Sequence, residues 1–201
     1  KSVHFEAVVE RSKPRTVQFV ENRAVTAAAA RGWDPISANF LMPKWVASHR
    51  GCYLDGCKQG GRPGDLANWR VAKSIFVADD MATARDYVTR PDSPYQYYYR
   101  SLLTKLKKNG RANLFKEDQS MSDDEVTLDY VMERLVTYGT PDKVAEELLA
   151  FRELTGQFGT LLYAGHDWAD PELARRSKIL MAEKVLPLVN KAEKDQLKAA
   201  I

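Results

Sequence analysis

The protein has 201 residues, of which 44% are hydrophobic and 28% are charged, a composition typical of a folded globular domain and unlike a disordered chain. Lysine and arginine outnumber aspartate and glutamate by 30 to 27, and the two signs are interleaved, which disfavours nucleic acid as a partner. No apolar run approaches the roughly 18 residues of a membrane span, and no signal-peptide core is present at the N-terminus. We therefore expect a single cytoplasmic domain over residues 1–201, with neither a nucleic-acid nor a membrane partner.

The two cysteines, Cys52 and Cys57, are five residues apart on one predicted helix. That spacing places them about 140° apart around the helix axis, so they are expected to be free thiols. No further cysteine or histidine pair has the spacing of a zinc site, and no metal is expected.

The first half of the chain predicts two strand–helix units. Apolar residues alternate over Val3 to Val9, which indicates a strand, and Pro14 is suited to the first turn of a helix that ends at Gly32. Pro35 to Leu41 is a short apolar run that predicts the second strand. Apolar and aromatic residues then recur at helical spacing from Trp45 to Gly56.

Two more strands are expected further along the chain. Trp69 to Ala78 is the most strand-like segment, and either Asp79 or Asp80 caps the helix that follows, which ends at Val88. Gly159 to Gly165 is the fourth strand.

A helical insertion over about residues 91–137 separates the third and fourth strands. The four tyrosines within residues 95–99 are expected to form a packing face or a subunit contact rather than a ligand cage. Ser122 and Glu125 have the spacing of a capping box for a helix that reaches Tyr138.

Two helices with proline starts flank the fourth strand. The Thr-Pro pair at residues 140–141 begins a helix that stops at Gly156. The Asp-Pro pair at residues 170–171 begins the long last helix, which is expected to run through Val189. Residues 191–201 are then expected to form a C-terminal tail.

Alternating strands and helices, with strands buried on both faces, predict a parallel sheet in an α/β fold. Four such units are half of the eight that close a (β/α)8 barrel. A doubly wound sheet fits less well because no G-x-G-x-x-G turn follows any predicted strand. The four strands are expected to form one parallel sheet in chain order, completed by a missing N-terminal half or by another copy of the chain.

Four segments resemble the bacterial-luciferase-like, flavin-dependent monooxygenases, and within them the limonene-monooxygenase-like branch. They are WDPISANFL at residues 33–41, NWRVAKSIFVADD at 68–80, YGTPDKVAEELLAF at 138–151 and GQFGTLLYAGHDWADPELARRSKILMAEKVLPLVN at 156–190. The resemblance implies the C-terminal half of a luciferase-like (β/α)8 TIM barrel, with the helical insertion before the last strand. It also implies a two-component enzyme in which FMN, reduced by a separate flavin reductase, reacts with dioxygen and oxidises a small apolar organic substrate.

The resemblance places the flavin phosphate at the turn after the first strand. Ser12, together with Arg15 and Thr16 in the first helical turn, would meet the phosphate alongside free backbone N–H groups. The alternative is that Ser12 only caps the helix and the cations are solvated. The turn contains no glycine, which departs from the family pattern.

A wall of the flavin or substrate pocket is implied at the end of the second strand. Asn39 would orient a carbonyl or a ring edge, and Phe40 and Met42 would line the substrate pocket. The alternative for Asn39 is a role in forming the turn.

His166 and Trp168 follow the fourth strand, where a barrel has its active site. His166 is the candidate catalytic residue because imidazole transfers protons near neutral pH, and Trp168 is assigned to the substrate pocket. His4 and His49 are expected to make structural contacts instead. Lys73 is expected to extend its ammonium to solvent or to pair with a carboxylate.

Two other functions stay open. A deazaflavin-dependent oxidoreductase of the same superfamily would use the same barrel for hydride transfer. A half barrel without catalytic activity would serve only as a binding or assembly module.

Overall fold

The computed structural model describes residues 16–199 apart from Val20 and Asp167. Within it the chain forms two compact units. Unit 1 comprises residues 1–73 and 151–163, and unit 2 comprises residues 74–150 and 164–201. The strand expected at Val3 to Val9 lies outside the described residues.

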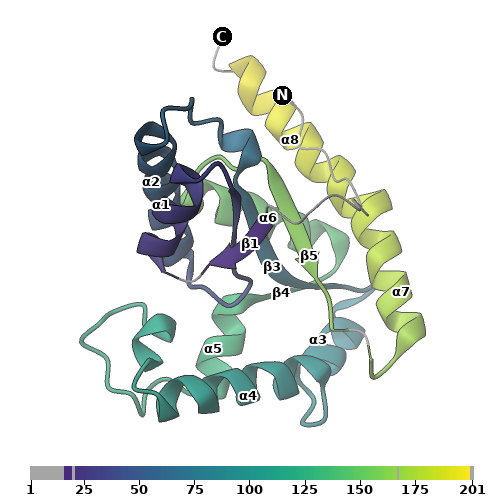
Figure 1. The fold of residues 1–201 in the computed structure, drawn as a ribbon. Helices are drawn as coiled ribbons and strands as arrows, with labels where there is room; N and C mark the ends of the chain where they lie inside the picture. The colour runs from purple at the N-terminus through teal and green to yellow at the C-terminus, as the bar shows by residue number, and fades with distance from the viewer. Residues whose placement is uncertain (1–15, 20, 167, 200–201) are drawn as a thin grey trace. The chain divides into compact units, whose positions relative to one another are not determined.

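Unit 1 contains short parallel strands and a pair of helices (Figure 1). Its elements are β1 (Thr16–Phe19), α1 (Asn22–Ala30), β2 (Asp34–Ser37), α2 (Pro43–Gln59), a 3-10 turn (Leu66–Asn68), the first half of β3 (Arg70–Val77) and most of β5 (Thr160–Ala164). Strand β2 pairs in parallel with β1 and with the start of β3, and β5 also pairs with β3.

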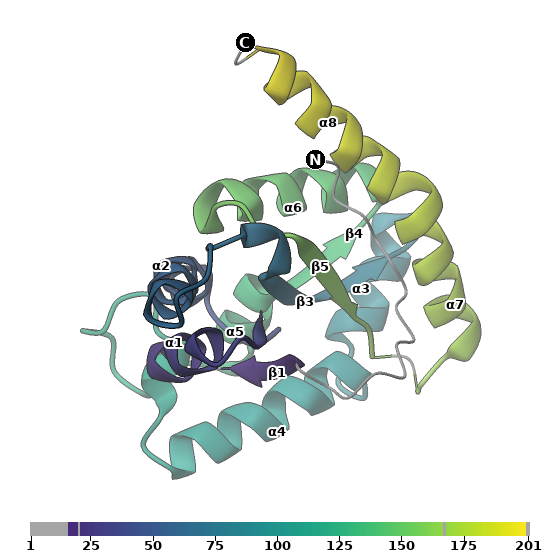
Figure 2. The same ribbon diagram turned by 45° about the horizontal axis from the view of Figure 1, so that its top comes forward.

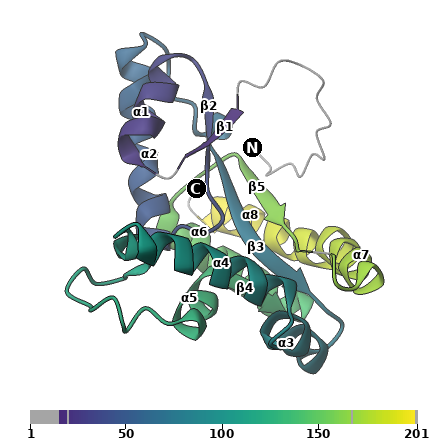
Figure 3. The ribbon, with the colours of Figure 1, turned by 60° about the horizontal axis from the view of Figure 1, so that its bottom comes forward.

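Helices α1 and α2 lie side by side in unit 1 (Figure 3). Their close approach depends on Gly56, because a Cβ atom at that position would lie 2.4 Å from the carbonyl oxygen of Thr26. The fully buried Tyr53 is on the same helix and donates a hydrogen bond to the carbonyl of Asp65 at 2.9 Å. Burial raises the pKa of the Tyr53 hydroxyl, so this tyrosine acts as an anchored core residue.

Unit 2 is mostly helical. Its elements are the second half of β3, α3 (Met81–Thr89), α4 (Pro94–Lys108), a 3-10 turn (Ala112–Phe115), α5 (Leu128–Leu135), β4 (Val136–Gly139), the start of α6 (Pro141–Thr155), α7 (Pro171–Leu180) and α8 (Leu186–Ala199). Strand β4 pairs in parallel with Ser74–Val77 of β3. Helix α7 continues into α8 through one π-helical turn, Met181–Val185 (Figure 2).

The local helix signals in the sequence are confirmed where a cap, a proline or a glycine marks the boundary. The Asp80 carboxylate accepts the N–H of Thr83 at 2.8 Å and begins α3, and the Asp170 carboxylate accepts the N–H of Leu173 at 3.0 Å and begins α7. Gly156 follows the last residue of α6 with a φ of 84°, a left-handed conformation that favours glycine.

The helix start predicted near Pro14 is wrong. Thr16 belongs to strand β1, and the helix begins later, at Asn22. The local signal of the proline is outweighed by backbone pairing, because Thr16 lies opposite Asp34 in the parallel register of β1 and β2. Thr16 is therefore not in a helical turn.

The insertion is also less helical than expected. Ser122 and Glu125 do form the predicted capping box, with the Ser122 N–H donating to the Glu125 carboxylate at 2.7 Å. The helix nevertheless begins only after Thr127, whose hydroxyl is its cap, and it ends at Leu135 rather than at Tyr138. The four residues that follow form β4 because the second half of β3 offers them a parallel partner.

The predicted sheet order and the predicted C-terminal tail both need correction. Strand β4 comes between the third and fourth predicted strands along the chain, and β5 pairs with β3. Strand β3 is eight residues long and its neighbours are four or five, so it has backbone groups for more than two short partners. The segment expected as a tail is helical through Ala199.

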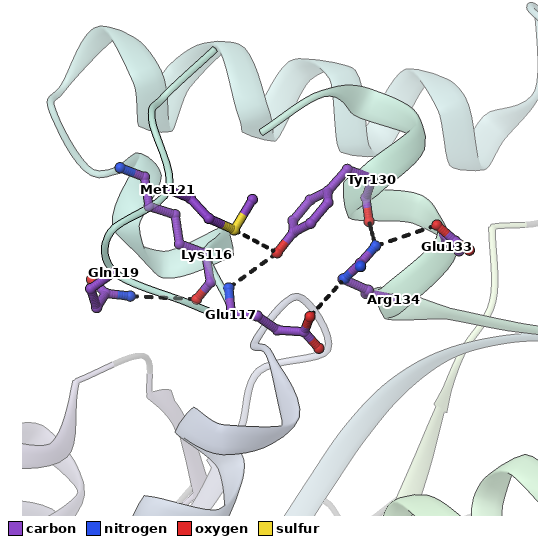
Figure 4. A network of polar contacts seen from close by, with 7 residues as sticks. All are labelled: Lys116, Glu117, Gln119, Met121, Tyr130, Glu133 and Arg134. Carbon is purple, nitrogen blue, oxygen red and sulfur yellow. Dashed lines mark hydrogen bonds and ion pairs between the residues drawn. The ribbon is translucent and has the colours of Figure 1, made fainter. Parts of the chain in front are cut away.

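A polar network holds the loop that leads into α5 (Figure 4). The Arg134 guanidinium lies 3.9 Å from the ring centre of Tyr130 and donates to the Glu117 carboxylate at 3.1 Å. The Tyr130 hydroxyl accepts the N–H of Glu117 at 3.1 Å and donates to the Met121 sulfur at 3.4 Å. One face of α5 is thereby fixed to the preceding loop.

Cys52 and Cys57 are free thiols, as predicted. Among the described residues, none of the helices is both long and apolar enough to cross a bilayer. In the same part of the chain, no group of three or more histidine, cysteine, aspartate or glutamate side chains could hold a metal ion.

Candidate functional site

The loop after β2 contains three of the predicted site residues. Asn39, Phe40 and Met42 lie between the end of β2 at Ser37 and the first residue of α2, Pro43. The carboxyl ends of parallel strands are where α/β proteins carry their sites. Asn39 and Met42 are buried and Phe40 is half-buried. The loop is therefore largely packed into unit 1, with one buried amide side chain among apolar ones.

Ser37, the last residue of β2, belongs to a buried polar network. The Trp69 indole N–H donates to the Ser37 hydroxyl at 3.0 Å, and the same hydroxyl lies 2.8 Å from Nδ1 of His49. Because the indole can only donate, the serine oxygen is the acceptor of that bond and its proton is available for Nδ1 of His49. The structural role predicted for His49 is confirmed, whereas His4 lies outside the described residues.

Lys73 is also a buried structural residue of unit 1. Its ammonium lies 5.1 Å from the ring centre of Phe151, in a cation–π contact on α6. The expectation that the ammonium extends to solvent is therefore wrong, because the side chain is buried.

His166 and Trp168 lie together in the loop after β5. The His166 side chain is 8% exposed, and its ring centre is 5.6 Å from that of Trp168 at an interplanar angle of 70°. Trp168 itself is 59% exposed. A buried imidazole and an exposed indole are thus in contact at the carboxyl end of a parallel strand.

Helix α4 supplies the other rings around His166. Tyr95 meets the imidazole edge-on at 4.6 Å between ring centres, and Tyr98 lies at 4.5 Å with a tilt of 31°. The Tyr95 hydroxyl donates to the carbonyl of Ile75 on β3 at 2.6 Å, which fixes α4 against the strand. The Tyr87 hydroxyl donates to the His166 carbonyl at 2.9 Å and fixes the backbone of the loop.

The expected packing role of the tyrosine run is confirmed for two of its members. Tyr95 and Tyr99 are fully buried, and the Tyr99 hydroxyl donates to the Ser74 hydroxyl at 2.9 Å. Burial raises the pKa of Tyr99 well above its usual range. Tyr97 differs, because it is 69% exposed and meets Trp168 edge-on at 6.3 Å. No local pattern indicates that the run packs against His166, because this contact joins segments that are far apart in the chain.

Most of the predicted phosphate turn lies outside the part of the chain that the structure describes. Ser12 and Arg15 lie outside the described residues, and Thr16 is on strand β1. The remaining predicted residues form two groups. Asn39, Phe40 and Met42 share one loop of unit 1, whereas the pair formed by His166 and Trp168 belongs to unit 2.

Tyr97, His166 and Trp168 form an aromatic cluster in unit 2. Tyr97 and Trp168 present exposed aromatic surface, and aromatic surface with a few polar groups is typical of small-molecule sites. The buried His166 imidazole is in ring contact with Trp168.

Comparison with known proteins gave similarities over most of this chain, although no family model matches it. The chain is 32% identical over 154 residues to 4-hydroxyprotoasukamycin monooxygenase of Streptomyces nodosus subsp. asukaensis, which covers 77% of this chain and 38% of that protein. It also matches the structure of the oxygenating constituent of 3,6-diketocamphane monooxygenase from Pseudomonas putida, described as a type II Baeyer-Villiger monooxygenase in complex with FMN. That match has a TM-score of 0.74 and 24% identity, and it covers 87% of this chain and 48% of the other.

A third match differs in its cofactor. The coenzyme F420-dependent tetrahydromethanopterin reductase of Methanopyrus kandleri matches with a TM-score of 0.55 at 16% identity, over 86% of this chain and 50% of the other. The chain thus spans half or less of the length of each of these proteins.

Proposed function

Because the chain belongs to the bacterial-luciferase-like, flavin-dependent monooxygenases, we propose that it takes part in oxidising a small apolar organic substrate with reduced FMN and dioxygen. The fold class is as predicted, an α/β fold that matches about half of a luciferase-like barrel. The observation that carries the proposal is the contact between the His166 imidazole and the exposed Trp168 ring, at the end of a strand where a barrel has its active site.

The described side chains suit a flavin ring chemically. The isoalloxazine of FMN is a flat aromatic system with one hydrogen-bonding edge, and its ends differ in polarity. Within unit 2, Trp168 and Tyr97 offer exposed aromatic surface for the flat part. Asn39 of unit 1 carries an amide with both a donor and an acceptor, and its role at the polar edge is a separate proposal. The residues proposed to hold the phosphate are Ser12, Arg15 and Thr16, of which Thr16 lies on strand β1 and not in a helical turn.

Bound reduced FMN would supply the electrons that activate dioxygen, and the protein would supply position and exclusion of water. Trp168, which is 59% exposed, is the residue of unit 2 proposed for the substrate pocket, and Phe40 and Met42 are the residues proposed for it from unit 1. His166 would hold a proton beside that pocket, with its ring kept in place by Tyr95 and Tyr98.

A flavin reductase is the proposed partner that delivers reduced FMN. The Pseudomonas putida protein is the oxygenating constituent of its monooxygenase, and this supports a system with separate parts. A second partner surface is proposed on the inner face of the sheet, to be covered by a missing N-terminal half or by another copy of the chain. Leu162 on β5 supports this, because it is 37% exposed although it is a leucine within a strand.

Activity with a reductase tests the proposal. The protein, a flavin reductase, NADH, FMN and a panel of small cyclic ketones and terpenes would be incubated in air. Oxygenated product formed in step with NADH consumption is expected, and a His166→Ala variant is expected to lose product. If the protein gives no oxygenated product with any of these substrates, the proposal is contradicted and the reading as a non-catalytic binding or assembly module is favoured.

The alternative is an oxidoreductase that uses a deazaflavin for hydride transfer. The fold match to the Methanopyrus kandleri reductase, which depends on coenzyme F420, supports this alternative. Absorbance spectra of the protein titrated with FMN and with coenzyme F420 separate the two proposals. A cytoplasmic location remains our proposal as well.

A further inference from the structure

A cavity in unit 2 carries a second inference, which does not depend on the proposed function. It has a volume of about 400 Å³ and is bounded by α3, α4, α5, β4 and α6. None of the described residues assigned to flavin or substrate lines it. Its size is within the range of small-molecule sites.

The floor of the cavity is apolar. Val88, Met132 and Val136 line it, and all three side chains are buried. The Tyr138 residue adds part of an aromatic ring to the wall. A ligand that fills this space therefore needs an apolar portion.

The rim of the cavity is acidic. Asp129 and Glu133 of α5 and Glu147 of α6 contribute three carboxylates, and Lys143 is the one lysine or arginine among the lining residues. The lining therefore has a net charge of −2, from three negative and one positive side chain. An anionic ligand is disfavoured by this charge, and a cationic ligand is favoured.

The Lys143 ammonium is already engaged within the protein. It forms an ion pair with Glu147, donates to the Tyr138 carbonyl at 3.1 Å and lies 5.3 Å from the centre of the Tyr138 ring. The contact with the Tyr138 ring shows that a cation is accommodated in this wall. Lys143 and Glu147 neutralise each other, so the net charge of the lining comes from Asp129 and Glu133, and Glu133 forms an ion pair with Arg134 outside the lining.

Those two carboxylates differ in their partners. Glu133 accepts a hydrogen bond from Arg134 at 3.3 Å, and Arg134 is itself held by Glu117 (Figure 4). Among the described residues, no hydrogen bond or ion pair ends on the carboxylate of Asp129. Asp129 lies one helical turn before Glu133, so both acids face the same side of α5.

The neutral polar side chains of Thr89 and Gln96 in the lining already have partners in the protein, and the Thr89 hydroxyl donates to the Arg85 carbonyl at 2.9 Å. The Gln96 amide N–H donates to the Thr89 carbonyl at 3.2 Å, and its oxygen accepts from Arg100 at 3.0 Å. Selectivity therefore comes from the carboxylates and the apolar floor. We propose that this cavity binds a primary alkylammonium group, with the ammonium at Asp129 and Glu133 and the alkyl chain over Met132.

Such a group is carried either by a free amine or by a lysine side chain of a partner protein. The methyl signal of Met132, in the full protein labelled with ¹³C-methyl methionine, reports on both. n-Pentylammonium is expected to shift this signal in a saturable way, and n-pentanol and pentanoate are expected to leave it unchanged. Nα-acetyl-lysine methylamide distinguishes the sources, because tighter binding than the free amine assigns the site to a partner's lysine.

The variant that tests the carboxylates is the double substitution Asp129→Asn with Glu133→Gln, which keeps the shape and removes the charge. It is expected to weaken n-pentylammonium binding at least tenfold, whereas Glu146→Gln, an exposed acid of α6 outside the cavity, is expected to have no effect. An unshifted Met132 signal in the ligand-free double variant shows that the floor is intact. The proposal is overturned if n-pentanol binds as well as the amine, if the double variant binds like the original protein, or if the amine causes no shift up to about 10 mM.

Discussion

The Tyr87 hydroxyl on α3 donates a 2.9 Å hydrogen bond to the backbone carbonyl of His166, in the loop after β5. The ring of Tyr87 stacks on Phe76 of β3 at 4.2 Å, so the hydroxyl is presented from a fixed position. This bond ties the loop that carries His166 and Trp168 to the core of unit 2. The position of the candidate catalytic imidazole therefore depends on a tyrosine outside the predicted site.

Replacement of Tyr87 by phenylalanine tests that dependence. The stacking on Phe76 is retained, while a buried carbonyl loses its donor, so we expect the free energy of unfolding to fall by about 1 kcal/mol. Chemical denaturation measures the change. Tyr97→Phe is the matched control, because the exposed Tyr97 is expected to tolerate the same change. Equal effects of the two substitutions would show that the Tyr87 hydroxyl does not hold the loop.

The network of Ser37, His49 and Trp69 predicts a larger loss of stability. Ser37→Ala removes the acceptor of the buried Trp69 indole N–H and the partner of His49 Nδ1 at once. We expect a loss of about 2 to 3 kcal/mol in the free energy of unfolding, because two buried polar groups lose a hydrogen bond. Ser120→Ala, at an exposed serine, is the control. A loss as small as that of the control would contradict the structural role of Ser37.

Much of the helical structure could be predicted because its signals are local. The helices that begin at Met81, Pro141 and Pro171 follow an aspartate cap or contain a first-turn proline, and these residues act on their own backbone. Strands β1 and β4 could not be predicted in this way. Val136 continues the apolar pattern of the preceding helix, and it becomes a strand residue only because Ser74, 62 positions earlier, pairs with it.

The candidate site shows the same difference between local signals and distant contacts. The position of His166 and Trp168 after a strand follows from the order of elements along the chain. The rings that surround His166 come from α4, and the sequence contains no local sign of that contact. Residues that act through distant packing are therefore the ones that sequence patterns miss.

The ion pair between Asp79 and Arg176 predicts a pH dependence of stability. The Arg176 guanidinium donates to both carboxylate oxygens at 2.6 and 2.9 Å, and the hydrogen bond holds the pKa of Asp79 below its usual range. The folded-state pKa is thus lower than the unfolded value of about 3.9, so the contribution is present above that value and is lost as the pH falls through the folded pKa.

We therefore expect Asp79→Asn to be less stable than the original protein at pH 7 and equally stable at strongly acidic pH. Both side chains are exposed, so the difference should shrink at high salt. Thermal unfolding at several pH values and salt concentrations measures it, with Asp55→Asn as an exposed control. A difference that is the same at all pH values would contradict the assignment to this ion pair.

The phosphate assignment predicts a specific loss of flavin affinity. Ser12→Asp would place a negative charge beside the proposed phosphate position, and FMN binding should weaken by more than about 1.4 kcal/mol, or tenfold. Riboflavin, which lacks the phosphate, should be affected less. Fluorescence quenching of the flavin measures both. Unchanged FMN affinity would show that the phosphate binds elsewhere.

The most direct test of the central proposal is cofactor choice by the protein itself. In a fluorescence titration, we expect saturable binding of FMN in preference to coenzyme F420. We also expect weaker FMN binding in both Asn39→Ala and Trp168→Ala, since these side chains are assigned to the ring and the pocket. Preferential binding of coenzyme F420, or FMN binding that neither substitution changes, would contradict the account.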